Sequence, residues 1–193
     1  MRIIGGVWRG RRIEFAHAAE VRPTPDRVRE TLFNWLQLRV AGSRCLDLYA
    51  GSGALGIEAL SRGAKSVVFV DSAAAAVREI EKTLARFGCD RARFVTGDAG
   101  RFLRTERQSF NIIFLDPPFS RRALADDCRV IAERGLLAPG GVVYLEGPAA
   151  GGVPDLPAGW EILRSKEAGE VGYHLARSAA PGEDGQNGAD EKH

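Results

Sequence analysis

The stretch from 111 to 119, NIIFLDPPF, ends an apolar run with one carboxylate, two prolines and an aromatic ring. The carboxylate of Asp116 and the carbonyl of Pro117 can each accept one hydrogen of a planar exocyclic amine and so hold its nitrogen for attack. Pro117 and Pro118 add no competing N–H donors, and their fixed φ keeps the acceptors in place. Phe119 can stack on a base, a contact worth ~1–3 kcal/mol. We therefore predict these four residues to be catalytic at an amino group; a plain strand-ending turn is the alternative.

A glycine loop lies about 60 residues earlier, in the stretch LDLYAGSGALGIEAL. Gly51, Gly53 and Gly56 have G-x-G-x-x-G spacing between an expected strand and an expected helix, which allows a tight turn and close approach to a ligand. Asp71 follows 20 residues after Gly51, at the tip of the next strand, where it can accept hydrogen bonds from both ribose hydroxyls. The pattern favours a cofactor that contains a nucleoside. Alone it is weak, and a merely tight turn is the alternative.

Asp47 distinguishes between possible cofactors. It lies four positions before Gly51, where its charge would repel a pyrophosphate and suit a cationic amino acid group. S-adenosylmethionine has such a group, with an ammonium, a sulfonium and no phosphate. The stretch DLYAGSG resembles the first motif of class I methyltransferases, and Asp71 resembles their ribose-binding acid. Asp98, with the Ala99 amide beside it, resembles the residue that contacts adenine in that family, although a helix N-cap is an equal alternative for Asp98.

Alternating strands and helices must position these residues. From residue 44 onward, apolar strands are expected to end near Asp47, Asp71, Thr96, Asp116 and Glu146, at the spacing of βαβ units. The carboxyl ends of such strands meet at one edge of the sheet, where ligands bind. The stretch from 160 to 177 predicts a closing antiparallel hairpin. We expect an α/β fold of the Rossmann-like class I methyltransferase type, with a mostly parallel seven-stranded sheet and helices on both faces.

The ends of the chain differ from this central pattern. Residues 2–15 predict a β-hairpin, and residues 24–39 predict a helix with Thr24 as N-cap and Pro25 at its first position. Ser72 is the expected N-cap of a later helix. We expect residues 1–40 to form an extension docked on the sheet, residues 41–177 to form the main domain, and residues 178–193 to be a disordered acidic tail, because that tail has few large apolar side chains.

Composition limits the class of protein. The chain has 193 residues, 45% of them apolar, and a net charge of +2, which suits one soluble domain. Residues 1–40 hold eight arginines and four acids, so that end is suited to phosphate groups, although an ordinary solvated surface is the alternative.

The three cysteines are far apart and have no metal-binding spacing, so neither a disulfide nor a metal site is expected. No apolar run approaches the ~20 residues of a membrane span. No secretory signal is visible, and the expected location is the cytoplasm.

The motif DPPF resembles the fourth motif of amino-group methyltransferases, which act on adenine N6, guanine N2 or protein amides. Together with MRIIGGVWRGRRI, RPTPDRVRETLFNWL and CLDLYAGSGALGIEALSRGA, it resembles the bacterial 16S rRNA guanine-N2 methyltransferases of the small-subunit head. The likeness covers residues 1–177, and it departs from the usual RPTTD at Pro25. It implies methyl transfer from S-adenosyl-L-methionine to guanine N2 of 16S rRNA, within an assembling small subunit, by a monomer without metal or membrane.

The resemblance also assigns residues. The implied catalytic residues are Asp116, Pro117, Pro118 and Phe119. The implied cofactor site comprises Asp47, Tyr49, Gly51, Gly53, Asp71, Ser72, Asp98 and Ala99. The family's N-terminal motif, which borders the active site and is expected to touch RNA, is matched by Arg22, Thr24, Arg27 and Arg29. We hypothesise in addition that an RNA groove is flanked by Arg9, Arg11, Arg12, Arg121 and Arg122.

Three other functions remain open at this point. A DNA adenine-N6 methyltransferase would use the same DPPF motif, but such enzymes usually add a target-recognition segment, for which this chain has little room. A nicotinamide-nucleotide-binding oxidoreductase would use the glycine loop. A non-enzymatic RNA-binding protein would use the arginines, but it would give the DPPF motif no purpose.

Overall fold

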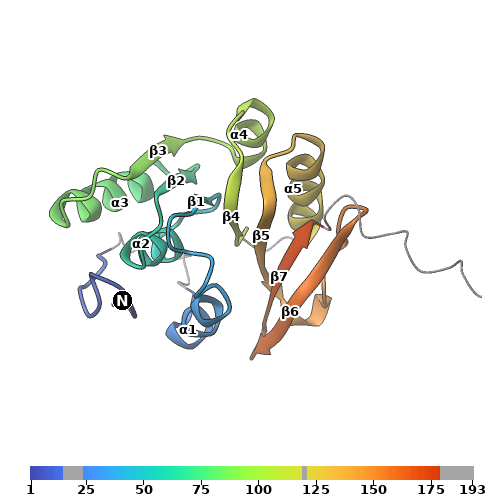
Figure 1. The fold of residues 1–193 in the computed structure, drawn as a ribbon, viewed down its shortest axis with the longest axis horizontal. Coiled ribbons are helices and arrows are strands. Elements are labelled where there is room, and N and C mark those ends of the chain that lie inside the picture. Colours follow the sequence, from blue (N-terminus) through green and yellow to red (C-terminus); the bar gives the residue numbers. More distant parts are fainter. Residues whose placement is uncertain (15–23, 119–120, 179–193) are drawn as a thin grey trace, which may run out of the picture.

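The computed structural model describes residues 1–14, 24–118 and 121–178, and the side chains of Arg121 and Arg122 lie outside the described set. A seven-stranded sheet has the strand order β3-β2-β1-β4-β5-β7-β6 (Figure 1). Its first five strands are parallel, and β7 pairs antiparallel with both β5 and β6. The predicted fold class and closing hairpin are confirmed. The strands are β1 (Arg44–Asp47), β2 (Ser66–Asp71), β3 (Ala92–Thr96), β4 (Phe110–Leu115), β5 (Leu137–Pro148), β6 (Trp160–Ala168) and β7 (Val171–Ser178).

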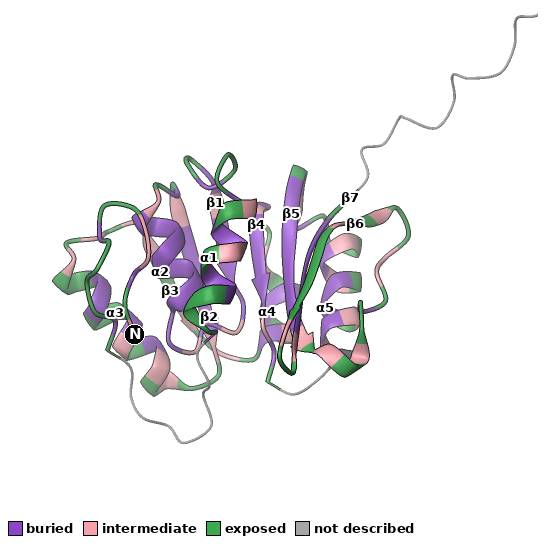
Figure 2. Ribbon diagram, turned by 90° about the horizontal axis from the view of Figure 1, so that it is seen from below, coloured by how far each residue is buried: buried purple, intermediate pink, exposed green. Residues whose placement is uncertain are grey.

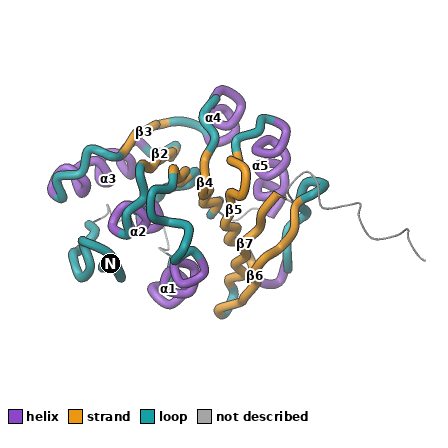
Figure 3. Tube along the Cα trace, in the orientation of Figure 1, coloured by secondary structure: helices purple, strands orange, loops and turns teal. Residues whose placement is uncertain are grey.

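Helices cover both faces of the sheet (Figure 3). Helices α1, α2 and α3 pack into one hydrophobic cluster, and α4 and α5 pack into the other. The central strands supply alternate residues to the two clusters, as Ile112 and Ile113 of β4 do, because successive side chains of a strand point to opposite faces. The helices are α1 (Asp26–Trp35), α2 (Ala54–Ser61), α3 (Ala74–Arg86), α4 (Ala99–Thr105) and α5 (Arg121–Glu133), with a 3-10 turn η1 (Ala149–Gly151) after β5.

Four neighbouring strands bring a carboxylic acid to the same edge of the sheet. β2 ends at Asp71, β1 ends at Asp47, and Asp116 directly follows β4. In β5, Glu146 follows Leu145, which pairs with the last residue of β4. These four acids, which we call the acidic edge, therefore lie in the spatial order Asp71, Asp47, Asp116 and Glu146. The strands that position them are buried along most of their length (Figure 2).

Two helix caps differ from the sequence prediction. Pro25 occupies the N-cap position of α1 without a side-chain hydrogen bond, so Thr24 is not the cap. Ser72 does not cap α3, because the Asp71 carboxylate accepts a hydrogen bond from the Ala73 amide at 2.8 Å and already serves the start of that helix. The Thr24 prediction was wrong because α1 begins one residue later, with Pro25 at its N-cap. The Ser72 prediction was wrong because Ala73 is the N-cap of α3 and Asp71 supplies the hydrogen bond there.

The N-terminal segment forms a turn with a single antiparallel bridge, between Arg2 and Arg12, within the described ranges. Within the described residues, this one bridge is all that remains of the predicted β-hairpin. The backbone amides of Ile4 and Gly5 donate instead to the two carboxylate oxygens of Glu58 in α2, at 2.9 and 2.7 Å. These donors are therefore unavailable for strand pairing, and the segment is docked on α2.

Glycine is required where this segment meets α2. Gly6 has φ +77°, and a Cβ there would lie 1.9 Å from the carbonyl oxygen of Ser61. The ring of Trp8 packs against that of Phe87, which follows α3, with 5.1 Å between the ring centroids.

No helix in the described part of the chain is both long enough and apolar enough to cross a membrane.

Candidate active site

The glycine loop connects β1 to α2 and is shaped by two acids of the acidic edge. Gly51 and Gly53 have φ values of 52° and 74°, in the left-handed region that favours glycine. The Gly51 amide donates to Asp71 Oδ2 at 2.8 Å, and the Gly56 amide donates to Asp47 Oδ2 at 2.9 Å. A Cβ at Gly56 would lie 2.2 Å from the ring of Phe69. The third glycine is thus needed for close packing of α2 on the sheet, a role that was not predicted for it from the sequence.

Asp71 is partly exposed at the tip of β2. Its Oδ1 accepts from the Ala73 amide and its Oδ2 from the Gly51 amide, both at 2.8 Å. These bonds fix the carboxylate in place, and each oxygen keeps a further lone pair for an incoming donor. The geometry suits a pair of ribose hydroxyls.

Asp47 is 3% exposed at the end of β1, and within the described residues no cation forms an ion pair with it. Burial raises the pKa of Asp47 to about 7, and repulsion by Asp71 raises it further, while the hydrogen bond from the Gly56 amide opposes the rise. A buried carboxyl without a cation is costly, and an arriving ammonium group would relieve that cost. The residues present therefore fit the cationic amino acid group of S-adenosylmethionine.

Asp116 and Pro117 lie directly after β4. Burial raises the pKa of Asp116 well above its usual range, and repulsion by Glu146 and by Asp47 adds to the rise. Pro117 is buried and Pro118 is exposed. Phe119 lies outside the described residues, so its stacking on a base stays a prediction.

Glu146 is a residue of this site that the sequence argument did not select. It is 6% exposed and accepts a hydrogen bond from the Tyr144 hydroxyl at 2.7 Å. Burial raises the pKa of Glu146, and hydrogen bonds from Tyr144 and Thr24 oppose the rise. Its signal in the sequence was an acid at the end of the strand expected beside β4.

The predicted adenine side of the site contains a second unpredicted acid. The Tyr49 hydroxyl donates to Asp127 Oδ2 at 2.6 Å, and burial raises the pKa of Asp127 to about 6. Burial is the main cause of the raised pKa values of Tyr49 and Asp127, and the nearby Asp98 adds to both. Asp98 also caps α4 by accepting from the Arg101 amide at 2.8 Å. The capping alternative for Asp98 is confirmed, and an adenine contact remains a prediction. Ala99 begins α4 and is 9% exposed. Asp127 lies within α5, where no motif marks it.

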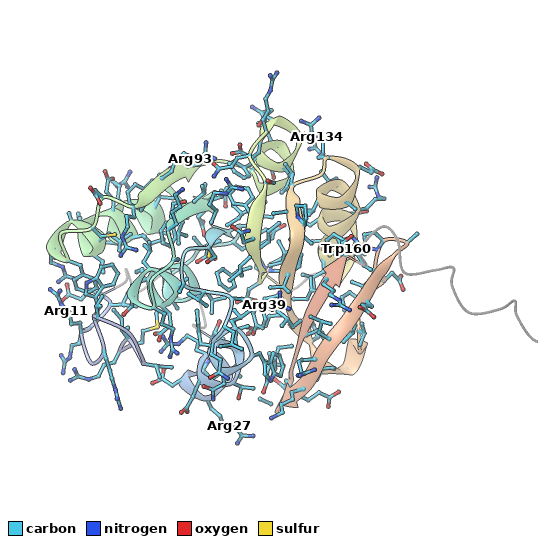
Figure 4. The ribbon with its side chains drawn as sticks, in the orientation of Figure 1. Arg11, Arg27, Arg39, Arg93, Arg134 and Trp160 are labelled. Carbon is cyan, nitrogen blue, oxygen red and sulfur yellow. The ribbon has the colours of Figure 1, made fainter. Side chains whose placement is uncertain are left out.

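Most of the described arginines that were assigned to RNA are exposed. Arg9, Arg12 and Arg27 are on the surface. Arg11 is exposed too, and its guanidinium lies 3.9 Å from the ring centroid of Phe87. Figure 4 shows Arg11 and Arg27 at the periphery of the molecule. Arg22 and the side chains of Arg121 and Arg122 lie outside the described residues, so their assignments stay predictions.

Arg29 does not belong to that surface, and its assignment to RNA was wrong. It is 0% exposed and donates to the Arg2 carbonyl at 2.9 Å and to Asp26 Oδ1 at 2.6 Å. Its Nη1 lies 3.5 Å from Glu58 Oε2 in α2. Arg29 faces the core because it lies in the buried stripe of α1 with Val28, so its charge joins α1 to α2 and to the N-terminal segment.

The strand order, the glycine loop after β1 and the acids at the carboxyl edge define a class I S-adenosylmethionine-dependent methyltransferase fold. A family model described as Conserved hypothetical protein 95 matches residues 1–177, and the chain belongs to that family. Among the described residues, no group of three or more histidine, cysteine or acidic side chains is placed to hold a metal ion.

Several named proteins and solved structures are similar to this chain over most of its length. Ribosomal RNA small subunit methyltransferase D of Escherichia coli K12 is 43% identical over 95% of this chain and 92% of its own length. The protein of the same name from Haemophilus influenzae is 37% identical over 91% of this chain and 92% of its own. A solved structure from Escherichia coli, provisionally described as the methyltransferase YhhF, has a TM-score of 0.87 at 40% identity and covers 93% of this chain and 98% of its own.

Proposed function

We propose that this chain transfers a methyl group from S-adenosyl-L-methionine to the exocyclic N2 of a guanine in 16S rRNA. One observation carries the proposal: Asp116 and Pro117 follow β4 directly beside β1, where the buried Asp47 has no cationic partner among the described residues. Acceptors for an amine thus lie next to an anionic site for a cation, which is the arrangement that methyl transfer from a sulfonium to a nitrogen requires.

Residues at the ends of three strands contact three different parts of the cofactor. When bound, S-adenosylmethionine supplies a methyl group already activated by a positively charged sulfur. Asp47 holds the cationic amino acid group, and Asp71 accepts from the ribose hydroxyls. Asp98 and the Ala99 amide receive the adenine, and Tyr49 and Ser72 border the same loops. Gly51 and Gly53 let the backbone come close enough for these contacts.

The acceptors at β4 prepare the nucleophile. A guanine amine is planar because its lone pair is delocalised into the ring, so it attacks poorly. The Asp116 carboxylate accepts one N–H and the Pro117 carbonyl accepts the other, which directs the nitrogen toward the methyl group and lets it pyramidalise. With the cofactor bound, its methyl group would pass to this nitrogen and leave S-adenosylhomocysteine, and the methylated amine would then lose its extra proton to water. Positioning supplies most of the acceleration. Pro118 stiffens the corner, and Phe119 stacks on the base.

The substrate follows from the relatives' names and from the arginines. Two relatives at 43% and 37% identity are named for methylation of small-subunit ribosomal RNA. Phosphate contacts by exposed arginines give affinity that falls with salt, and the target base must unstack into the pocket. The contributing arginines are Arg9, Arg11, Arg12, Arg22, Arg27, Arg121 and Arg122. The chain acts as a cytoplasmic monomer on an assembling small subunit, with residues 1–40 bordering the RNA and residues 41–177 forming the methyltransferase domain.

A methylation assay tests this proposal. Small-subunit particles that lack the modification are incubated with the protein and S-adenosylmethionine carrying a labelled methyl group, and the product nucleoside is identified and mapped. The expected product is N2-methylguanosine at one position of 16S rRNA. Label in N6-methyladenosine, or label in a DNA duplex offered in parallel, would replace this function with the adenine alternative. Calorimetry with S-adenosylmethionine against NAD separates both from the oxidoreductase.

A further inference from the structure

Ser61, the last residue of α2, has no part in the chemistry described so far, yet it is hydrogen-bonded three times to residues 2–12, which we call the N-terminal turn. Its Oγ donates to the Gly5 carbonyl at 2.6 Å and accepts from the Trp8 amide at 3.0 Å. Its carbonyl accepts from the Val7 amide at 2.8 Å. Because Ser61 is only 2% exposed, water competes little for these bonds.

The inner side of the N-terminal turn is held by α2 at a second place and by the core. Glu58 accepts from the amides of Ile4 and Gly5, at 2.9 and 2.7 Å. The side chains of Ile3 and Trp8 are buried, at 2% and 8% exposed, and they belong to the hydrophobic cluster that contains α2. The turn therefore has its own shape in the protein without RNA.

The outer side of the turn carries the three exposed arginines, Arg9, Arg11 and Arg12. One of them also braces the turn against the end of α3. The guanidinium of Arg11 lies 3.9 Å from the ring centroid of Phe87 and donates to the Arg86 carbonyl at 3.3 Å. The arginines thus stand on a turn that two helices hold in place.

Helix α2 joins this turn to the cofactor loop. It begins at Ala54, directly after Gly53 of the glycine loop, and it ends at Ser61. At the rise of an α-helix, its 8 residues span roughly 12 Å. Near its start, the Gly56 amide donates to Asp47 at 2.9 Å, so that end is fixed on the sheet. One short helix therefore sets where the arginines lie relative to the cofactor.

We propose that the N-terminal turn is a preformed RNA-binding element and that Ser61 is the positioning residue that holds it at a fixed place relative to the cofactor. A segment that becomes ordered only on binding loses affinity to the entropy of ordering, whereas a turn already held by buried hydrogen bonds does not. Phosphate contacts fix the register of a bound nucleic acid, so a fixed turn places one base at the pocket. The inference rests on the proposed function, because it concerns how the RNA of that reaction is placed.

Hydrogen exchange of the protein without RNA tests the preformed shape. The amides of Ile4, Gly5, Val7 and Trp8 all donate to acceptors on α2, so we expect slow exchange at all four. In Ser61→Ala the Trp8 amide loses its acceptor, and its exchange should become at least about tenfold faster. Fast exchange of all four amides in wild type would overturn the proposal.

Binding to unmodified small-subunit particles over a range of salt concentrations tests the positioning. In Ser61→Ala the arginines are unchanged, so the slope of log affinity against log salt should stay at the wild-type value. The affinity itself should fall about tenfold, which is the size of the cost of ordering roughly one residue of backbone. The KM for RNA should rise by the same factor, while kcat and the affinity for S-adenosylhomocysteine stay near wild type.

Ser43→Ala is the matched control. Ser43 is 4% exposed, and its Oγ donates to the Val40 carbonyl at 2.6 Å, a buried bond of the same kind that does not involve the N-terminal turn. This variant should lower the unfolding temperature about as much as Ser61→Ala and leave RNA affinity unchanged. Equal RNA affinities in the two variants, or an altered salt slope in Ser61→Ala, contradict the proposal. If wild type methylates no RNA, the proposed function fails, while hydrogen exchange still decides whether the turn is preformed.

Discussion

Glu58 and two acids of the acidic edge, Asp47 and Glu146, are carboxylic acids buried in different surroundings. Glu58 in α2 is 0% exposed, but it accepts from the amides of Ile4 and Gly5 and from Arg62 Nε at 2.8 Å, and Arg29 lies beside it at 3.5 Å. Each of its two carboxylate oxygens therefore accepts at least one hydrogen bond, and two arginines offset its charge. This cluster joins the N-terminal segment, α1 and α2, and it serves the fold.

The acids of the acidic edge accept hydrogen bonds, but none of them forms an ion pair with a cation within the described residues. Asp47, Asp116 and Glu146 have raised pKa values because burial is not offset by any cation of the described chain. Unpaired buried acids cost stability, and they persist where a ligand supplies what the chain does not. In this molecule, the buried acid that is paired with arginines joins elements of the fold. The buried acids that have no cationic partner among the described residues lie at the proposed reaction site.

The largest expected effect comes from removing the acceptor at β4. Asp116→Ala is expected to lower single-turnover methylation by orders of magnitude, because the amine loses the group that orients it. Cofactor affinity by calorimetry should stay near wild type. Asp116→Asn should lose rate comparably while unfolding at the same or a higher temperature, since an amide cannot ionise at this desolvated position. Near-normal turnover in either variant would remove Asp116 from the mechanism.

Glu58→Gln should affect stability instead of chemistry. Breaking the buried ion pair leaves Arg29 with only the exposed carboxylate of Asp26 as a counter-charge, which costs up to about 3–5 kcal/mol in the free energy of unfolding. Urea denaturation measures this loss. The matched control is Glu79→Gln, whose partner Lys82 is 69% exposed in its side chain, and that pair is expected to contribute less than about 1 kcal/mol. Equal losses in the two variants would refute the assignment of Glu58 to the fold.

The exposed arginines should have the smallest effect on the folded protein and a specific effect on RNA. Replacement of Arg9, Arg11 and Arg12 by alanine should lower RNA affinity and reduce the slope of log affinity against log salt by about 2 to 3. Binding titrations over a range of salt concentrations measure it. A second triple variant, Arg104, Arg107 and Arg129 to alanine, removes the same charge from exposed positions on and near α4 and α5. Equal slopes in the two triple variants would mean that the N-terminal arginines do not contact RNA.

How much the sequence could predict depended on the range of the interaction. The strand ends and the glycine loop were predictable, because parallel strands bring their carboxyl ends together whatever the details of packing. Asp71 and the DPPF corner were found in this way. Arg29 was not, because its partner Glu58 lies 29 residues away on another helix, and its charge alone suggested a surface. Thr24 was predicted in two ways: the local pattern suggested a helix cap, which was wrong, and the family resemblance placed it in a motif that borders the active site. In the folded chain Thr24 lies near Asp116 and Glu146.

Proton release on cofactor binding tests the meaning of the unpaired acids most directly. The pKa of Asp47 is raised to about 7, so at pH 6 most of the protein carries this proton. An ammonium group beside Asp47 lowers that pKa and expels the proton. Calorimetry with S-adenosylhomocysteine, which has the same ammonium, in two buffers of different ionisation enthalpy should give close to one proton released by wild type at pH 6. Asp47→Asn should release close to none and bind more weakly. No release by wild type, with unchanged affinity in Asp47→Asn, would contradict the account.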